Sequence, residues 1–189
     1  MSKIIRFAAT LVCAAVSLVP ATAVAQGEPS FIDCQYGFAV IFPSPPTARD
    51  IGYSTNTGAI VPARQFFLEQ GADRFMVTVA TFSGGPAVDL REMEHAATTL
   101  STRGELRYEG SGEYEPGLPG RQLNIFERSG RQIRASVYMV ERRLYITEVS
   151  AAPGDFPALQ FEQSITLIDS MGIDRTHMPP DEPRKFTCR

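Results

Sequence analysis

Hydrophobic and polar residues alternate most regularly in residues 120–150, where two short polar breaks separate three alternating runs. Because successive side chains of a strand point to opposite faces, this pattern predicts a three-stranded antiparallel meander. Large apolar residues share one face only if residues 128–130 form a three-residue loop and residues 141–142 a two-residue loop. Gly130 then takes the left-handed conformation of a bulged turn. The expected core face consists of Leu123, Ile125, Ile133, Ala135, Val137, Met139, Leu144 and Ile146.

The other face of this meander is only half apolar and needs partial cover. Its residues are Phe126, Tyr138, Tyr145, Thr147 and Val149. Residues 153–168 are expected to supply that cover as a helix, because Pro157 suits a first helical turn and Asp155 suits the cap before it. The apolar side of this segment carries Leu159, Phe161, Ile165 and Ile168.

Two stretches nearer the N-terminus have the pattern of strands with apolar residues on both faces. Residues 31–42 predict one first strand, and the prolines directly after it end the pattern because proline cannot donate to a ladder. Residues 64–70 and 73–82 predict a hairpin around Gly71 and Ala72, with glycine suited to the first position of a type II′ turn. Strands that are apolar on both faces indicate a sheet covered on both sides.

A helix is predicted over residues 87–102, where apolar residues recur at three- and four-residue spacing. That stripe consists of Leu90, Met93, Ala97 and Leu100. Asp89 and Glu92 resemble a capping box at the start of the helix, and Gly104 ends it. The spacing gives the helix one apolar side that can pack against a sheet.

The remaining stretches carry weaker patterns. Residues 47–61 predict a loop or a weakly formed strand, and residues 105–109 predict a short strand. Residues 110–120 are rich in glycine and proline and predict a mobile turn region. No internal repeat is present, so we expect one α+β domain over residues 26–173 and an extended tail over residues 174–189.

The first residues have the composition of a secretory signal peptide. Lys3 and Arg6 precede an apolar run over residues 7–19, and small residues ending at Ala25 form an A-x-A cleavage site. The apolar run is shorter than the ~20 residues that span a bilayer, and no second such run follows. The sequence therefore predicts removal of residues 1–25 and a periplasmic or secreted product without a transmembrane segment.

Charge and composition narrow the classes of partner. The chain has 189 residues, of which 43% are hydrophobic and 21% are charged, as in ordinary globular domains. Removal of the predicted leader takes away two basic residues and no acidic ones, which changes the formal net charge from −3 to −5. Nucleic-acid contacts require clustered Lys and Arg, so this balance argues against a nucleic-acid partner and against an electrostatic membrane patch.

Cys34 and Cys188 are the cysteines of the expected mature product, one near each end. Exported proteins meet oxidising conditions, so a disulfide between these residues is expected. The alternative is a pair of free thiols or a metal site, which the absence of CxxC spacing disfavours. A disulfide requires the tail to return to the first strand.

Four short motifs lie in or next to the predicted strands and helices. They are YGFAVIFP at residues 36–43, LPG at residues 118–120, RLY at residues 143–145 and FEQS at residues 161–164. Together with the predicted mid-chain helix, they resemble small exported bacterial proteins of the PsbP/Mog1-like type over about residues 35–168. The resemblance implies an α/β/α sandwich with a central antiparallel sheet of about six strands. A two-layer α+β fold of the cystatin-like kind is the alternative.

The resemblance also implies an accessory, binding or assembly role. The motifs that carry it are structural and contain no catalytic group. The chain has no plastid-type leader, which sets it apart from the photosystem subunit of that type.

Catalytic and metal-binding motifs are sparse. His95 lies beside Glu92 and Glu94 in the predicted helix, but no further His or Cys completes a metal site. A solvated helical face is the simpler interpretation. His177 lies near acidic residues of the tail, where an oxygen-rich cation site competes with a plain polar tail. Exposed amides at residues 83–85 could hold an anion, although no phosphate-loop spacing is present. We therefore expect no catalytic residue, no metal and no cofactor.

Basic and aromatic residues gather around the meander. Those that could dock an acidic partner or stack on a ligand are Arg131, Arg134, Tyr138, Arg143 and Tyr145. The alternative is that the charges at strand ends prevent edge association. The leading hypothesis is a non-enzymatic protein that binds an envelope protein or a small ligand. The alternatives are a hydrolase or other enzyme with an unrecognised site around His95, and a structural envelope component without a pocket.

Overall fold

The structure is a computed structural model that describes residues 31–83, 86–115, 118–175 and 184–188, without the side chains of residues 86–89 and 112–115. The predicted leader lies outside these residues, as does most of the predicted tail. Removal of the leader and export therefore stay predictions.

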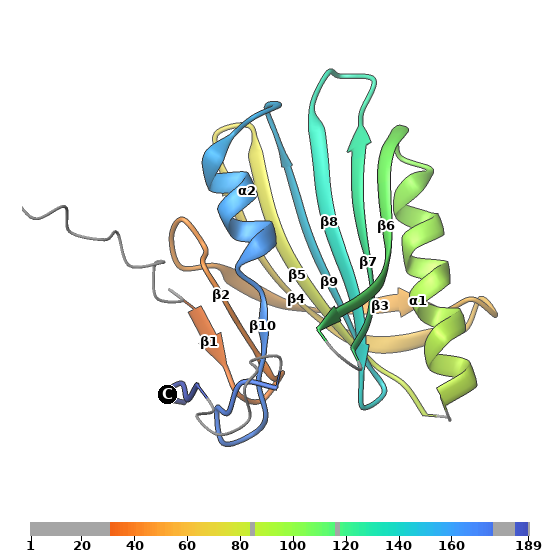
Figure 1. Ribbon diagram of the computed structural model, residues 1–189, viewed down its shortest axis with the longest axis vertical. Helices are drawn as coiled ribbons and strands as arrows, with labels where there is room; N and C mark the ends of the chain where they lie inside the picture. Colours follow the sequence, from red (N-terminus) through yellow and green to blue (C-terminus); the bar gives the residue numbers. More distant parts are fainter. Residues whose placement is uncertain (1–30, 84–85, 116–117, 176–183, 189) are drawn as a thin grey trace, which may run out of the picture.

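In the described residues, seven antiparallel strands form the main sheet in the order β3-β4-β5-β9-β8-β7-β6 (Figure 1). Their bounds are β3 (Thr47–Ser54), β4 (Ile60–Gln70), β5 (Asp73–Thr81), β6 (Glu105–Glu115), β7 (Leu118–Phe126), β8 (Gln132–Val140) and β9 (Arg143–Ala151). The helices α1 (Pro86–Ser101) and α2 (Phe156–Gln163) pack on this sheet. A smaller sheet contains β1 (Phe31–Asp33), β2 (Phe38–Val40) and β10 (Thr166–Leu167). The fold is α+β, as the sequence predicts.

The central meander of β7, β8 and β9 has the register that the alternating pattern requires. Ile125 faces Ile133 across β7 and β8, and Met139 faces Leu144 across β8 and β9. Gly130 has a φ of 83°, as the predicted bulged loop demands. The predicted core face is buried or partly buried throughout. Both loop lengths and the dry face of the meander are therefore confirmed.

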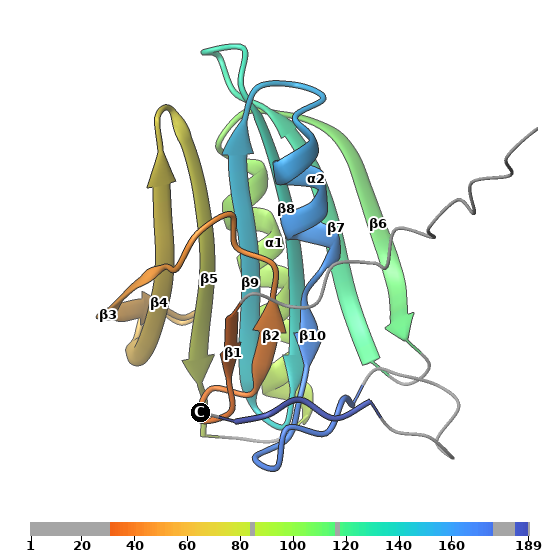
Figure 2. The same ribbon diagram turned by 90° about the vertical axis from the view of Figure 1, so that its left-hand side faces the viewer.

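Each face of the main sheet has its own core. On one side α1 covers the dry face of the meander with Met93, Ala96, Ala97 and Leu100. On the other side lie α2 and the small sheet, one beyond the other along the same face (Figure 2). Phe161 of α2 packs there against Phe42 and Phe75, with ring centroids 4.9 and 5.4 Å apart. The elements thus form three layers, whereas the cystatin-like alternative has two.

The first predicted strand, residues 31–42, is in fact two short strands joined by a turn. The Asp33 carboxylate accepts a hydrogen bond from the backbone N–H of Tyr36 at 2.8 Å, and its carbonyl accepts one from Gly37 at 2.8 Å. Gly37 has a φ of 77°, a conformation that glycine adopts without strain. The prediction of one continuous strand is wrong because these turn residues reverse an otherwise apolar run.

The structure also corrects the predictions at both edges of the main sheet. β3 is a full strand where residues 47–61 predicted a loop or a weak strand, and β6 extends to Glu115 through part of the predicted turn region. An edge strand pairs on one side only, so polar residues and glycine are tolerated in it. Gly120 lies in β7 opposite Tyr138, and a Cβ there would lie 2.8 Å from the tyrosine ring. This glycine makes room for a buried ring rather than a turn.

Two details predicted for the first helix are wrong. α1 begins at Pro86, so Asp89 lies inside the helix rather than at a cap. The Glu92 carboxylate accepts a hydrogen bond from the backbone N–H of Asn56 at 3.0 Å instead of capping the helix. Leu90 is 51% exposed, and Ala96 completes the buried stripe. The apolar spacing from residue 93 onward is sufficient to anchor the helix.

The second helix starts as the sequence predicts. Asp155 accepts a hydrogen bond from the backbone N–H of Ala158 at 2.9 Å, and Pro157 lies in the first turn. Glu162 turns a carboxylate into the core against β8, where Ser136 donates a hydrogen bond to it at 2.5 Å. A buried carboxylate must be hydrogen-bonded in this way to offset its lost hydration. The helix is thereby fixed in place on the sheet.

Candidate functional site

A cleft of about 530 Å³ opens at one end of the main sheet. Its lining residues come from four segments, residues 34–37, 81–83, 140–145 and 167–175. These segments are the β1–β2 turn, the end of β5, the β8–β9 hairpin and the chain around and after the end of β10. Small-molecule sites commonly enclose ~300–1,000 Å³, so this cleft has the size of a ligand site.

The β8–β9 turn at the cleft has an unusual backbone for its sequence. Glu141 and Arg142 have φ values of 47° and 64°, and no other non-glycine residue in the described part of the chain has a positive φ. Two consecutive left-handed residues are typical of a type I′ turn, for which Asn-Gly is the favoured pair. Each non-glycine residue in this conformation costs about 1–2 kcal/mol. The turn therefore presents two charged residues at the cleft and lowers the stability of the fold.

An ion pair and a backbone hydrogen bond connect this turn to its neighbours. Arg175 Nη1 lies 2.6 Å from Glu141 Oε1, and the carbonyl of Arg142 accepts a hydrogen bond from the N–H of Phe82 at 2.9 Å. The hydrogen bond from Arg175 lowers the pKa of Glu141, so this carboxylate is ionised at neutral pH. Its side chain is 69% exposed, and exposed pairs of this kind contribute less than ~1 kcal/mol. The ion pair alone does not offset the backbone cost of the turn.

Two side chains of β9 hold the β1–β2 turn against the main sheet. The Tyr145 hydroxyl donates a hydrogen bond to the carbonyl of Tyr36 at 3.0 Å, and Arg143 Nη1 donates one to the carbonyl of Gln35 at 3.0 Å. Gly37 fits between them because a Cβ there would lie 3.0 Å from the Tyr145 hydroxyl. Burial raises the pKa of Tyr145, which keeps its hydroxyl a donor at neutral pH.

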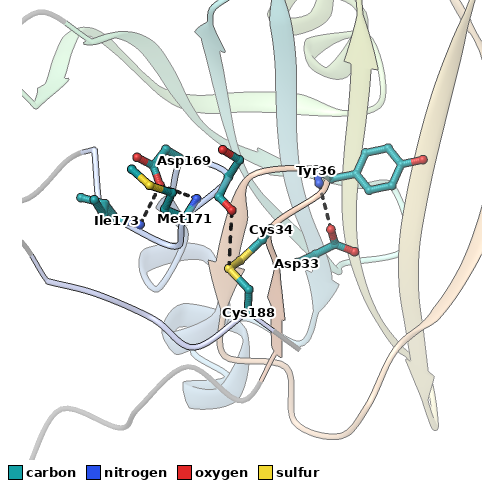
Figure 3. Close-up of a disulfide and its surroundings, with 8 residues drawn as sticks. Asp33, Cys34, Tyr36, Asp169, Met171, Ile173 and Cys188 are labelled. Atoms are coloured by element: carbon teal, nitrogen blue, oxygen red, sulfur yellow. Dashed lines mark hydrogen bonds between the residues drawn. A yellow bond between two sulfur atoms is a disulfide. The ribbon is translucent and has the colours of Figure 1, made fainter.

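A disulfide and a carboxylate brace another wall of the cleft (Figure 3). Cys34 and Cys188 are bonded, with Cα atoms 5.7 Å apart and a sequence separation of 154, which confirms the predicted pair. The Asp169 carboxylate accepts hydrogen bonds from the backbone N–H groups of Met171 at 2.8 Å and Ile173 at 2.9 Å. The backbone hydrogen bonds, that from Ile173 foremost, lower the pKa of Asp169. The Asp169 carboxylate therefore stabilises this wall of the cleft, and the oxygen that accepts both hydrogen bonds is already occupied.

Basic side chains outnumber acidic ones around the cleft. The lining residues with ionised side chains are Glu141, Arg142, Arg143, Asp169 and Arg175. Within the part of the chain that the structure describes, the Arg142 guanidinium makes no hydrogen bond or ion pair, and the hydrogen bond of Arg143 goes to a neutral carbonyl. The cleft thus offers two guanidinium groups that form no ion pair with a carboxylate of the described residues.

The structure brings two of the predicted ligand residues into this cleft. Arg143 and Tyr145 both line it. Tyr138 faces Tyr145 across the strands, but its side chain is 1% exposed and lies in the core. Both tyrosines belong to the core on the α2 side of the sheet, and Tyr145, which is 4% exposed, also lines the cleft.

The other two predicted ligand residues lie elsewhere on the sheet. Arg134 Nη2 is 3.2 Å from Glu162 of α2. Arg131 precedes β8 at the end far from the β8–β9 turn, and its Nη2 is 2.7 Å from Asp73. Both arginines therefore join neighbouring elements through ion pairs and do not line the cleft.

His95 and its two neighbouring glutamates do not converge on one site. His95 Nε2 lies 3.2 Å from the carbonyl of Ser54, and the ring packs edge-on against Tyr53. Glu92 binds a backbone amide as described above, and Glu94 pairs with Arg121. His95 is half-buried and is not among the residues that line the cleft.

The remaining sequence predictions concern a cation site in the tail, a metal site and a membrane-spanning segment. His177 and the acidic residues around it lie outside the described residues, apart from Asp174. Across the described ranges, no group of three or more His, Cys, Asp and Glu side chains gathers closely enough to hold a metal ion. Neither α1 nor α2 is both long enough and apolar enough to cross a membrane.

Sequence reasoning did not identify several residues of the cleft. Glu141, Asp169 and Arg175 come together only through the fold, and their separation along the chain gives no motif. One signal was present, because a two-residue hairpin loop without Gly or Asn is uncommon. Of the proposed amide site at residues 83–85, Ser83 lines the cleft and the two glycines lie outside the described residues.

The geometry of the cleft is the observation that bears on function, because the chain matches no protein-family model and no curated protein sequence.

Proposed function

We propose that this protein is a non-enzymatic binding protein that holds a small ligand in the cleft at the β8–β9 turn. The cleft is the observation that carries the proposal, since its size suits a small molecule and its arginines suit polar recognition. Histidine is absent from the lining residues, and Cys34 is in a disulfide. Both lining carboxylates are engaged, one by Arg175 and one by backbone amides. Among the described lining residues, therefore, no hydroxyl has a free base beside it, as a nucleophile would need.

The proposed architecture is the PsbP/Mog1-like α/β/α sandwich. The arrangement of α1 and α2 on opposite faces of an antiparallel sheet supports it. An accessory or binding role is what that resemblance implies, and it agrees with a cleft whose described lining residues include no histidine and no free thiol.

The proposed location is the periplasm or the extracellular medium. The disulfide fits an exported protein that meets oxidising conditions, and the predicted leader of residues 1–25 supports the same route. N-terminal sequencing of the product from the producing cell tests this proposal. The product is expected to begin at Gln26, and an intact N-terminal methionine would contradict it.

A ligand screen read out by NMR tests the binding function. The labelled product is mixed with a library of small polar metabolites, and binding is expected to shift amide resonances of residues 140–145 and 167–175. Thr81 is exposed and lines the cleft, so Thr81→Trp is expected to fill the cleft and abolish binding. Thr99→Trp, at an exposed position of α1, is the matched control and is expected to bind normally.

Two results would contradict the proposal. One is a library in which no compound shifts cleft resonances, and the other is a ligand that binds Thr81→Trp and the native protein equally. Turnover of a hydrolase substrate panel that His95→Ala abolishes would support the enzyme alternative instead.

A further inference from the structure

We infer that the ligand of the cleft is a small organic anion, gripped by the guanidinium groups of Arg142 and Arg143. This inference rests on the binding function proposed above and names its ligand class. Three observations on the cleft carry it: the charges that remain without a partner, the strained turn that presents one of them, and the fork geometry of arginine.

The charges of the lining residues leave two arginines available. Arg175 and Glu141 neutralise each other across 2.6 Å. Asp169 directs one carboxylate oxygen at two backbone N–H groups of its own loop. Arg142 and Arg143 remain, and no described carboxylate lies within ion-pair distance of either guanidinium. Three arginines against two carboxylates make the cleft positive in a chain whose formal net charge is −3.

The backbone of the β8–β9 turn costs stability that the side chains of Glu141 and Arg142 do not recover. Glu141 and Arg142 both occupy the left-handed region, where Asn and Gly would be unstrained. The ion pair of Glu141 is too exposed to offset that strain. Strained backbone of this kind concentrates at ligand sites, because the surrounding structure holds it there. The strained turn supplies the Arg142 side chain to the cleft.

The chemistry of the guanidinium selects the ligand class. Each guanidinium carries five N–H donors in a planar fork that matches the oxygens of a carboxylate or a phosphate. Arg143 donates one hydrogen bond, from Nη1, to the carbonyl of Gln35. This bond orients the guanidinium and leaves its other N–H donors available for a ligand. A cleft of about 530 Å³ is larger than an inorganic ion needs, and Tyr145, Leu167 and Ile168 are among its lining residues. The ligand is therefore an anion with an organic body.

Four probes of similar size and different charge test the ligand class. Benzoate, phenyl phosphate, benzylammonium and benzyl alcohol are titrated into the labelled native protein, and amide shifts are followed by NMR. Benzoate or phenyl phosphate is expected to shift residues 140–145 and 167–170, and the better of the two identifies a carboxylate or a phosphate site. Its affinity is expected to fall as salt is raised, because the contact is ionic.

Variants of single arginines test the residues. Arg142→Gln and Arg143→Gln are each expected to weaken binding of the preferred anion at least tenfold. Arg107→Gln is the matched control, because Arg107 is exposed on β6, outside the cleft, and loses the same charge. Arg143 also braces the β1–β2 turn, so Arg142→Gln gives the decisive result if the other variant does not fold.

The outcomes separate this inference from the proposed function. If benzylammonium or benzyl alcohol shifts the cleft resonances and the anions do not, the anion inference is wrong and the binding function stands. Binding of the anions that is equal in Arg142→Gln and the native protein also overturns it. If neither these probes nor the broader library shifts the cleft, both the inference and the proposed function are wrong.

Discussion

Replacing the β8–β9 turn by Asn-Gly is expected to make the protein more stable and to weaken its ligand binding. The double substitution Glu141→Asn/Arg142→Gly puts the favoured type I′ pair at positions whose φ values are 47° and 64°. Glycine at position 142 adopts the left-handed conformation freely and Asn at position 141 tolerates it better than Glu, so the two substitutions together relieve at most about 2–4 kcal/mol of strain. The lost pair with Arg175 subtracts less than ~1 kcal/mol, and the backbone freedom of the new glycine subtracts about 0.5–1 kcal/mol.

These terms sum to a net gain of at most about 3.5 kcal/mol, with a central value of about 2 kcal/mol. For a domain of this size each kcal/mol raises the melting temperature by about 2–4 °C, so the central value corresponds to a rise of about 4–8 °C. Urea and thermal denaturation of the native protein, the double variant and both single variants measure this change. The same samples are titrated with the anion that the native protein prefers. We expect weaker binding by the two proteins that lack Arg142.

Two results would refute this reasoning. A double variant no more stable than the native protein would show that the turn carries no strain in solution. A double variant that is more stable and binds the anion as well as the native protein would show that the strained pair does not serve the ligand. The single variant Glu141→Asn separates the effect of the lost ion pair from that of the lost Arg142 guanidinium.

Three further predictions concern the rest of the fold. Removing the disulfide with Cys34→Ser/Cys188→Ser should lower the free energy of unfolding by about 5 kcal/mol on the chain-entropy model, given the sequence separation of 154; an unchanged urea midpoint would contradict this. Asp155→Ala should lower the free energy of unfolding by about 1 kcal/mol through loss of the α2 cap, whereas Asp155→Asn should retain most of the stability. Equal urea midpoints of these two variants would argue against the cap. Burial, with the nearby charge of Glu92, raises the pKa of Tyr53 from 10.0 to about 12, so the folded state holds the phenolic proton more tightly than the unfolded state. This difference stabilises the fold fully below pH 10, and the stabilisation is lost as the pH rises toward 12. Urea unfolding at pH 9 and pH 11.5 should show a smaller alkaline loss in Tyr53→Phe, and an identical loss in both proteins would contradict the shifted pKa.

The central strands could be predicted from the sequence because burial of one face requires apolar residues at alternate positions. A slip of one residue in residues 120–150 would move Ile125 and Ile133 to the opposite face, so alternation determines both strands and register. The same reasoning fails where burial is weaker. β3 and β6 are edge strands whose polar residues and glycines resemble loop sequence. The turn at Asp33 and Gly37 interrupts an apolar run that periodicity alone treats as continuous.

The cleft could be predicted only in part. Arg143 and Tyr145 attract attention as basic and aromatic residues at the start of a strand, and both line the cleft. Their hydrogen bonds reach residues 35 and 36, which are 108 and 109 positions away in the sequence. No local pattern encodes contacts of such range. The predicted disulfide was the one sequence feature that brought the two ends of the domain to the same place.

The Cys34–Cys188 bond closes residues 34–188 into a covalent ring. A protease that cuts one exposed connection, such as the loop at residues 128–130 between β7 and β8, would open this ring without separating the pieces. The nicked protein would migrate as one full-size band in electrophoresis without reductant and as two fragments after reduction. The disulfide would in this way let the protein sustain a single backbone cut and keep every strand of its sheet attached.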